Sequence, residues 1–107
     1  MNWKSNIKEF RSYLLLERSL STNSVDSYVR DVKKLVEYLK LTKNNKKANQ
    51  LNSHEIRIFI QWIAELGMSS NSQARILSGI KAFYNYLLLE NLIKKNPTEL
   101  IEGPKIG

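Results

Sequence analysis

The stretch STNSVDSYVRD, residues 21–31, opens with small polar residues and continues with apolar residues at helical spacing. A second stretch, SSNSQARILSGIK at residues 69–81, is built in the same way. Small polar side chains are preferred at helix starts, where backbone N–H groups lack partners within the helix. Phosphate oxygens bind well to such ends. Two helices of this kind in one basic chain predict a surface that binds a polyanion such as DNA.

Apolar periodicity predicts an all-α chain with four main helices and no strand. The apolar stripes are Trp3, Ile7, Phe10 and Leu14; then Val25, Tyr28, Val32, Leu35, Val36 and Leu39; then Ile56, Phe59, Ile60 and Ile63, with Ile58 and Trp62 beside them; and last Leu77, Ile80, Tyr84, Leu87 and Leu88, with Ile76 and Phe83. Because the third helix is apolar around its circumference, we expect it to be the central and most buried one.

Helix starts and stops follow from local residue types. The first helix should end near Arg18, and the second should begin at an N-cap Ser21. A polar, Asn- and Lys-rich segment at residues 42–50 predicts a solvated loop. Ser53 is the expected N-cap of the third helix, and Gly67 its stop. Ser70 and Gln73 suit a capping box at the start of the fourth helix, which should end at Asn91.

The end of the chain differs in composition from the rest. Asn96-Pro97-Thr98-Glu99 predicts a short turn of helix, because proline suits a first helical position after a cap. Gly103-Pro104-Lys105-Ile106-Gly107 is typical of a linker. We therefore expect a domain at residues 1–102, and the start of a linker to an absent second domain at 103–107.

The bulk composition fits one globular domain with a polyanionic partner. The chain has 107 residues, a 42% apolar share, a net charge of +7 and no cysteine. The charge favours DNA, RNA or an acidic membrane surface, although a generally Lys-rich surface gives the same excess. No disulfide frame or thiolate metal site is possible. With no apolar leader and no run long enough to span a bilayer, we expect a cytoplasmic protein.

No constellation of catalytic or metal-binding residues is present. The only histidine, His54, suits the surface near a helix start, and the ten carboxylates are scattered. Asp26 and Arg30 have the spacing of an ion pair on one helix. Three tyrosines lie on or beside apolar stripes and should pack in the core: Tyr28, Tyr38 and Tyr84. We expect no enzyme active site, no cofactor and no metal within this chain.

Two helix faces carry the candidate DNA contacts. On the second helix the polar face is Asn23, Ser27, Arg30 and Lys34; on the fourth it is Ser72, Arg75, Ser78 and Ala82, with Lys81 at its margin. Small residues such as Ser78, Gly79 and Ala82 would allow close approach to a groove. The pattern leaves open that both are simply solvated helix faces.

The segments Leu20–Val32 and Ser72–Leu87 resemble the second-helix and fourth-helix signatures of the N-terminal, core-binding (SAM-like) domain of tyrosine recombinases, the phage integrase family. Asn96-Pro97 followed by Pro104-Lys105 resembles that domain's exit into the catalytic domain. The resemblance covers nearly the whole chain and is strongest to the Xer recombinases of the XerC and XerD type. Because the first helix begins almost at Met1, we expect no arm-binding domain in front of it.

The resemblance implies a compact helical bundle that forms one half of a C-shaped clamp on double-stranded DNA. The second and fourth helices would face the major groove of the core recombination site. The catalytic arginines, histidine and nucleophilic tyrosine would belong to a C-terminal domain, so this chain should bind DNA and cut nothing. The implied partners are that catalytic domain and other recombinase protomers on DNA, with no membrane; the isolated domain would be monomeric, and the parent a DNA-associated bacterial protein.

The contacts that carry over are Thr22, Asn23, Ser27, Arg30, Lys34, Ser72, Gln73, Arg75 and Lys81. Arg75 is the candidate for a base edge, because an arginine fork fits guanine. Thr22, Asn23, Ser72 and Gln73 lie in first turns and suit phosphates. Two other functions stay open. A protein-interaction module would use exposed apolar residues such as Leu15 or Leu89, and a stand-alone transcription factor would end near Gly107.

Overall fold

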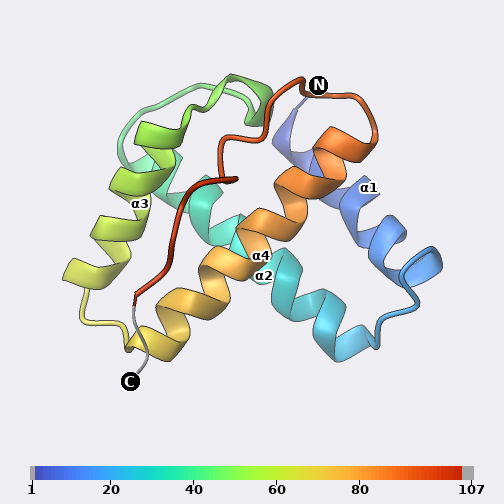
Figure 1. Ribbon diagram of the computed structural model, residues 1–107, viewed down its shortest axis with the longest axis horizontal. Coiled ribbons are helices and arrows are strands. Elements are labelled where there is room, and N and C mark those ends of the chain that lie inside the picture. The colour runs from blue at the N-terminus through green and yellow to red at the C-terminus, as the bar shows by residue number, and fades with distance from the viewer. Residues whose placement is uncertain (1, 105–107) are drawn as a thin grey trace.

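A computed structural model describes residues 2–104 of the chain. Its helices are α1 (Trp3–Leu16), α2 (Thr22–Leu41), α3 (Ser53–Glu65) and α4 (Ser70–Leu89), with a short 3-10 turn η1 (Ala48–Gln50) between α2 and α3 (Figure 1). The described part of the chain contains no strand. The predicted all-α bundle of four main helices is therefore confirmed.

The bundle is organised around the crossing of α2 and α4. In Figure 1, α4 crosses α2 in an X, with α1 on one flank and α3 on the other. The main helix pairs in contact are α2 with α4, α1 with α2, and α3 with α4. The N-terminal ends of α2 and α4 lie on the same side of the molecule, the lower side in the figure. The chain after α4 first crosses the upper side and then descends toward the start of α4.

The most buried helix is α4, and the prediction that the third helix would be central is wrong. Buried positions on α4 include Ile76, Phe83 and Tyr86. On α3 only one face is buried, because Ile58 stays 39% exposed and Trp62 is half-buried. The expected burial of Leu88 is also wrong, since that side chain is 39% exposed. A helix that packs against neighbours on two sides buries more than one on the flank, whatever its own apolar content.

Aromatic side chains fill the space between α1 and α4. The ring of Phe83 meets Phe10 edge-on at 5.3 Å between centroids and stacks on Trp3 at 5.9 Å. Tyr84 is fully buried, and its hydroxyl donates to the carbonyl of Ala48 at 2.8 Å. That bond anchors η1 to the core, because a buried hydroxyl needs a partner.

The predicted packing roles of the three tyrosines are confirmed. Tyr84 is buried, while Tyr28 and Tyr38 are half-buried and pack against the core. The predicted solvated loop at residues 42–50 is wrong in its second half, because Ala48 is buried in η1.

The start of α2 follows the prediction, and the start of α4 does not. Ser21 caps α2, and its hydroxyl accepts from the backbone N–H of Ser24 at 3.2 Å. On α4 the cap is Ser69, which accepts from the N–H of Ser72 at 3.2 Å, so the predicted Ser70–Gln73 capping box is absent. Gln73 instead donates its side-chain amide to the carbonyl of Met68 at 2.8 Å.

The start of α3 also lies one residue earlier than predicted. Asn52 is the N-cap, and it forms a reciprocal capping box with Glu55: Asn52 Oδ1 accepts from the Glu55 N–H at 2.9 Å, and Glu55 Oε1 from the Asn52 N–H at 3.2 Å. The predicted cap, Ser53, donates its hydroxyl to the carbonyl of Pro97 at 2.6 Å. Ser53 therefore ties α3 to the C-terminal segment.

The helix ends agree with prediction at Gly67 and Asn91, which have positive φ angles of 87° and 58°. Asn91 and the residue after it donate backbone bonds back into the last turn of α4, which is the usual Schellman pattern. α1 ends at Leu16, two residues before the predicted Arg18, because Ser19 takes a positive φ of 51°.

The predicted turn of helix after Asn96 is wrong, because residues 97–100 form a turn that is not helical. Asn96 Oδ1 accepts from the backbone N–H of Thr98 at 2.8 Å and from its hydroxyl at 2.6 Å. Ile101 is then buried, while Gly103 and Pro104 run on without regular structure. The predicted linker residues Lys105–Gly107 lie outside the described part of the chain.

Candidate nucleic-acid interface

The N-terminal ends of α2 and α4 form a candidate binding surface for an anion. Both helices begin at serine caps and carry no acidic residue in the first turn. Both ends lie on the lower side of the molecule in Figure 1. Thr22 and Asn23 are exposed there, and Ser72 and Gln73 are half-buried. Unpaired N–H groups and the helix dipole make such ends favourable for phosphate oxygens.

An ion pair joins the two helices behind this surface. Arg75 of α4 extends its Nη1 to Asp31 Oδ1 of α2 at 2.6 Å and to Ser27 Oγ of α2 at 3.1 Å. The Asp31 side chain is 2% exposed, whereas the Arg75 side chain is 48% exposed. Two predicted contact residues, Ser27 and Arg75, thus lie in contact. Asp31, for which the sequence predicted no role in binding, pairs with Arg75 beside them.

Gly79 makes room for the buried carboxylate. A Cβ on Gly79 would lie 2.5 Å from Asp31 Oδ2, which is closer than a Cβ atom approaches a non-bonded neighbour. Gly79 is itself buried on the face of α4 that meets α2. The prediction that Gly79 helps α4 approach a DNA groove is therefore wrong. Its lack of a side chain allows α4 to pack closely against α2.

Burial controls the electrostatics of Asp31. Loss of hydration raises the pKa of this carboxyl above its ordinary 3.8, although the neighbouring Arg75, and more weakly Arg30 and Lys34, act to lower it. A buried carboxylate is stable only where donors satisfy it. Arg75 is the donor here, so the position of its guanidinium is coupled to the α2 helix.

The other basic candidates do not all share one surface. Arg30 is exposed and Lys34 half-buried on the polar face of α2. Lys81 is half-buried on α4, and helix geometry places it about 120° around the axis from Arg75. Arg30 and Lys34 therefore extend the candidate surface, and Lys81 lies at its far margin.

The ion pairs near this surface differ from the one pair that the sequence predicted. Asp26 forms its ion pair with Arg11 of α1 at 2.5 Å, and the predicted Asp26–Arg30 pair is absent. This leaves Arg30 without an ion-pair partner among residues 2–104. Of the loop lysines, Lys46 pairs with Glu55 at 2.9 Å, so its ammonium is directed at α3.

The predicted exposed leucines are also only half right. Leu89 at the end of α4 is 59% exposed, but Leu15 is half-buried and packs against the core. Leu16, the next residue, is the exposed one at 79%. Leu16 and Leu89 are the last residues of their helices.

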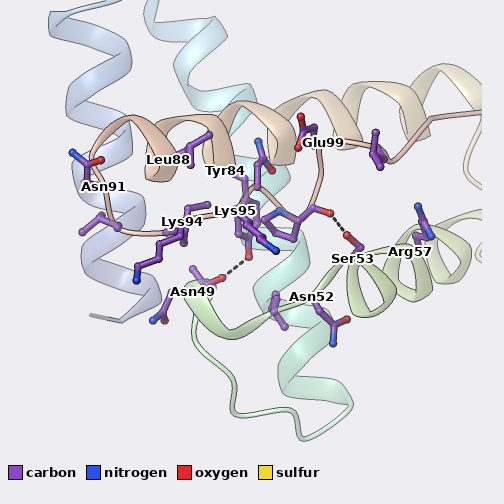
Figure 2. Close-up of a pocket in the computed structure, with 17 residues that line it drawn as sticks. Asn49, Asn52, Ser53, Arg57, Tyr84, Leu88, Asn91, Lys94, Lys95 and Glu99 are labelled. Atoms are coloured by element: carbon purple, nitrogen blue, oxygen red, sulfur yellow. Dashed lines mark hydrogen bonds between the residues drawn. The ribbon is translucent and has the colours of Figure 1, made fainter.

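A shallow hollow lies away from this surface, between α3, α4, η1 and the segment after α4 (Figure 2). Its lining includes Arg57, Lys94 and Lys95, and Tyr84 lies at its base with its hydroxyl already bonded to Ala48. His54 is exposed outside the hollow, as predicted. Within residues 2–104 no three His, Asp or Glu side chains cluster as metal ligands do, and no helix is long and apolar enough to cross a membrane.

Comparison with known proteins identifies the domain. The family model described as "Phage integrase, N-terminal SAM-like domain" matches residues 7–91. The chain belongs to this family. The match includes the whole of α2, α3 and α4 and the crossing of α2 with α4. The expected resemblance is therefore confirmed.

Relatives of this integrase SAM-like domain include tyrosine recombinases. "Tyrosine recombinase XerD" of Chlorobaculum tepidum is 36% identical over 105 residues, which is 98% of this chain and 34% of the relative. The XerD of Rickettsia bellii is 37% identical over 101 residues, 92% of this chain and 32% of the relative. The XerD of Listeria monocytogenes serovar 1/2a is 32% identical over 99 residues, which is 92% of this chain and 33% of the relative. The integrase SAM-like domain thus spans about a third of the length of these relatives.

Proposed function

We propose that this chain is the DNA-binding domain of a site-specific tyrosine recombinase and that it grips the core recombination site through α2 and α4. The observation that supports this most directly is the position of the starts of α2 and α4 on one side of a basic molecule. These two helices carry Arg30 and Arg75. Duplex DNA is a regular array of phosphates, and cationic side chains near helix N-termini suit it.

The residues divide by role in this proposal. Thr22, Asn23, Ser72 and Gln73 lie in or near first turns and contact phosphates. Ser27, Arg30 and Lys34 present the polar face of α2, and Arg75 contacts a base edge from α4. Lys81 adds a backbone contact at the margin.

Strand cleavage and rejoining belong to the remainder of a longer recombinase in this proposal. The residues after 102 lead into its catalytic domain, and the assembled protein acts with other protomers on DNA in the cytoplasm. The domain alone is a monomer and a weak binder, because it forms only half of a clamp.

Binding to a labelled duplex of about 20 base pairs tests the proposal, with anisotropy measured across a range of salt concentrations. We expect log K to fall linearly with log salt, because each neutralised phosphate releases counterions. Affinity that does not change with salt would refute the proposal.

Two double variants with equal charge change locate the surface. Arg30→Ala with Lys34→Ala removes two charges from the α2 face, and the salt slope should shrink by about two. Lys94→Ala with Lys95→Ala removes two exposed charges from the segment after α4, in the lining of the hollow shown in Figure 2. This second pair should bind within about twofold of the parent chain, because these lysines line the hollow and lie outside the polar faces of α2 and α4. Equal losses from both pairs would contradict binding through α2.

A further inference from the structure

The guanidinium of Arg75 forms hydrogen bonds through one of its three nitrogens, Nη1. Both of its hydrogen bonds within residues 2–104, to Asp31 and to Ser27, use Nη1. An arginine has five N–H donors in a rigid plane. Fixing Nη1 leaves Nη2 and Nε, and two adjacent donors are what a bidentate contact to guanine needs.

We infer that Asp31 is a positioning residue that holds Arg75 from behind, so that the Nη2–Nε edge is presented to a base of the bound DNA. The inference rests on the proposed function. It adds that sequence discrimination depends on a carboxylate that itself never touches DNA.

The burial of the pair supports this arrangement. Asp31 is 2% exposed and lies against Gly79, so it cannot swing out toward solvent or DNA without the helices separating. Arg75 is about half exposed, so the same ion pair has one fixed end inside and one accessible end outside. A side chain held in its bound conformation loses less entropy on binding.

The charge of Asp31 also changes what Arg75 recognises. The carboxylate offsets the positive charge of Arg75, which weakens its attraction to phosphates in general. Its remaining N–H donors still form directional hydrogen bonds with a base. Removing the charge of Asp31 should therefore strengthen binding to any sequence and weaken the preference for one.

Asp31→Asn tests this in the 107-residue chain, because asparagine keeps the shape and removes the charge. The probes are a duplex selected by the parent chain from a randomised pool and a shuffled duplex of the same composition. The matched control is Asp26→Asn, which makes the same charge change on the same helix but faces Arg11. Ser27→Ala removes the second acceptor of Nη1 and keeps the test open if Asp31→Asn does not fold.

We expect Asp31→Asn to lower the ratio of selected to shuffled affinity by about fivefold or more, the range of a bidentate base contact. The affinity of Asp31→Asn for the shuffled duplex should rise slightly. Asp26→Asn should show the same small rise, and its ratio of selected to shuffled affinity should stay unchanged. Ser27→Ala should lower the ratio less. In the free protein, ¹⁵N relaxation of the Arg75 Nε–H should show a rigid side chain that becomes mobile in Asp31→Asn.

Each result decides a different statement. A folded Asp31→Asn chain with an unchanged ratio overturns the inference, as does a mobile Arg75 Nε–H in the parent. A parent chain that binds duplexes without any sequence preference also overturns it, together with the proposed base contact of Arg75, and leaves DNA binding through α2 and α4 standing. A parent chain with no salt-dependent DNA binding refutes the proposed function itself.

Discussion

Gly79 of α4 and Asp31 of α2 occupy the same small space where the two helices cross. A Cβ added to Gly79 would lie 2.5 Å from Asp31 Oδ2 and 2.7 Å from its Cβ. The carboxylate takes the volume that a side chain at position 79 would need. The distance between the two helices therefore depends on this pair.

Gly79→Ala should destabilise the chain by about 1–3 kcal/mol, because the added methyl forces α2 and α4 apart. At an ordinary helix interior the same change stabilises by about 1 kcal/mol. Urea denaturation gives the free energy of unfolding. Adding Asp31→Ala should recover part of the loss, since it empties the contested space. A Gly79→Ala chain as stable as the parent would show that α2 and α4 can move apart at little cost in free energy.

Tyr84→Phe should cost about 1–2 kcal/mol, because it leaves the buried Ala48 carbonyl without its donor. Burial raises the pKa of Tyr84, so its hydroxyl stays protonated at neutral pH and donates throughout. Denaturation midpoints measure the loss. The control is Tyr38→Phe, at a half-buried ring in contact with Phe59 and Trp62 at 5.3 and 5.0 Å between centroids. Equal losses in both variants would mean that the Ala48 bond adds nothing specific.

Glu55→Gln should destabilise by about 0.5–1 kcal/mol at pH 7, and the loss should disappear in acid. Partial burial alone would raise the pKa of Glu55, but hydrogen bonds from Lys46, Asn44 and the Asn52 backbone outweigh it and lower the pKa below 4.5. The folded chain thus holds the ionised form more readily than the unfolded chain. The contribution of the charge is complete above pH 4.5 and is lost as pH falls through the folded-state pKa.

The measurement for Glu55 is the difference in unfolding free energy between variant and parent from pH 7 to pH 3. Because both chains retain Asp31, its own pH dependence cancels. Glu37→Gln, at an exposed position of α2, is the control and should show little difference at any pH. A Glu55→Gln difference that grows in acid would contradict the assignment.

Ser69→Ala should destabilise by about 1 kcal/mol, and Ser70→Ala by much less, because only Ser69 accepts from the backbone of the first turn of α4. Thermal melts of the two variants measure the difference directly. If Ser70→Ala were the more damaging change, Ser70 would be the cap and α4 would begin at Asn71.

The apolar stripes could be predicted from sequence because helical periodicity is local. Ile7, Phe10, Val32 and Ile80 are buried where the spacing requires. The choice between adjacent caps was less certain. Asn52 and Ser53, or Ser69 and Ser70, are equally good cap residues by type, and only the extended backbone of the first of each pair decides.

The candidate surface was predictable in outline and not in its contacts. The polar faces of α2 and α4 are visible in the spacing of Ser27, Arg30 and Arg75. The link between Arg75 and Asp31 spans 44 residues and exists only because the helices cross at a glycine. An acidic residue four positions after Ser27, opposite a helical glycine, was the available signal. The role of Asp31 could not be predicted without knowing that α2 and α4 cross at this point.

Asp31 is the tenth of the 20 residues of α2, and Gly79 is the tenth of the 20 residues of α4. The two helices therefore cross at their midpoints, and each can rotate about this point. With a rise of 1.5 Å per residue, each N-terminal arm extends about 14 Å from it. A rotation of about 10° at this point would move a helix start by about 2 Å, enough to change its register against a row of phosphates. A single methyl group at position 79 would act on the spacing of the two helix starts without touching either one.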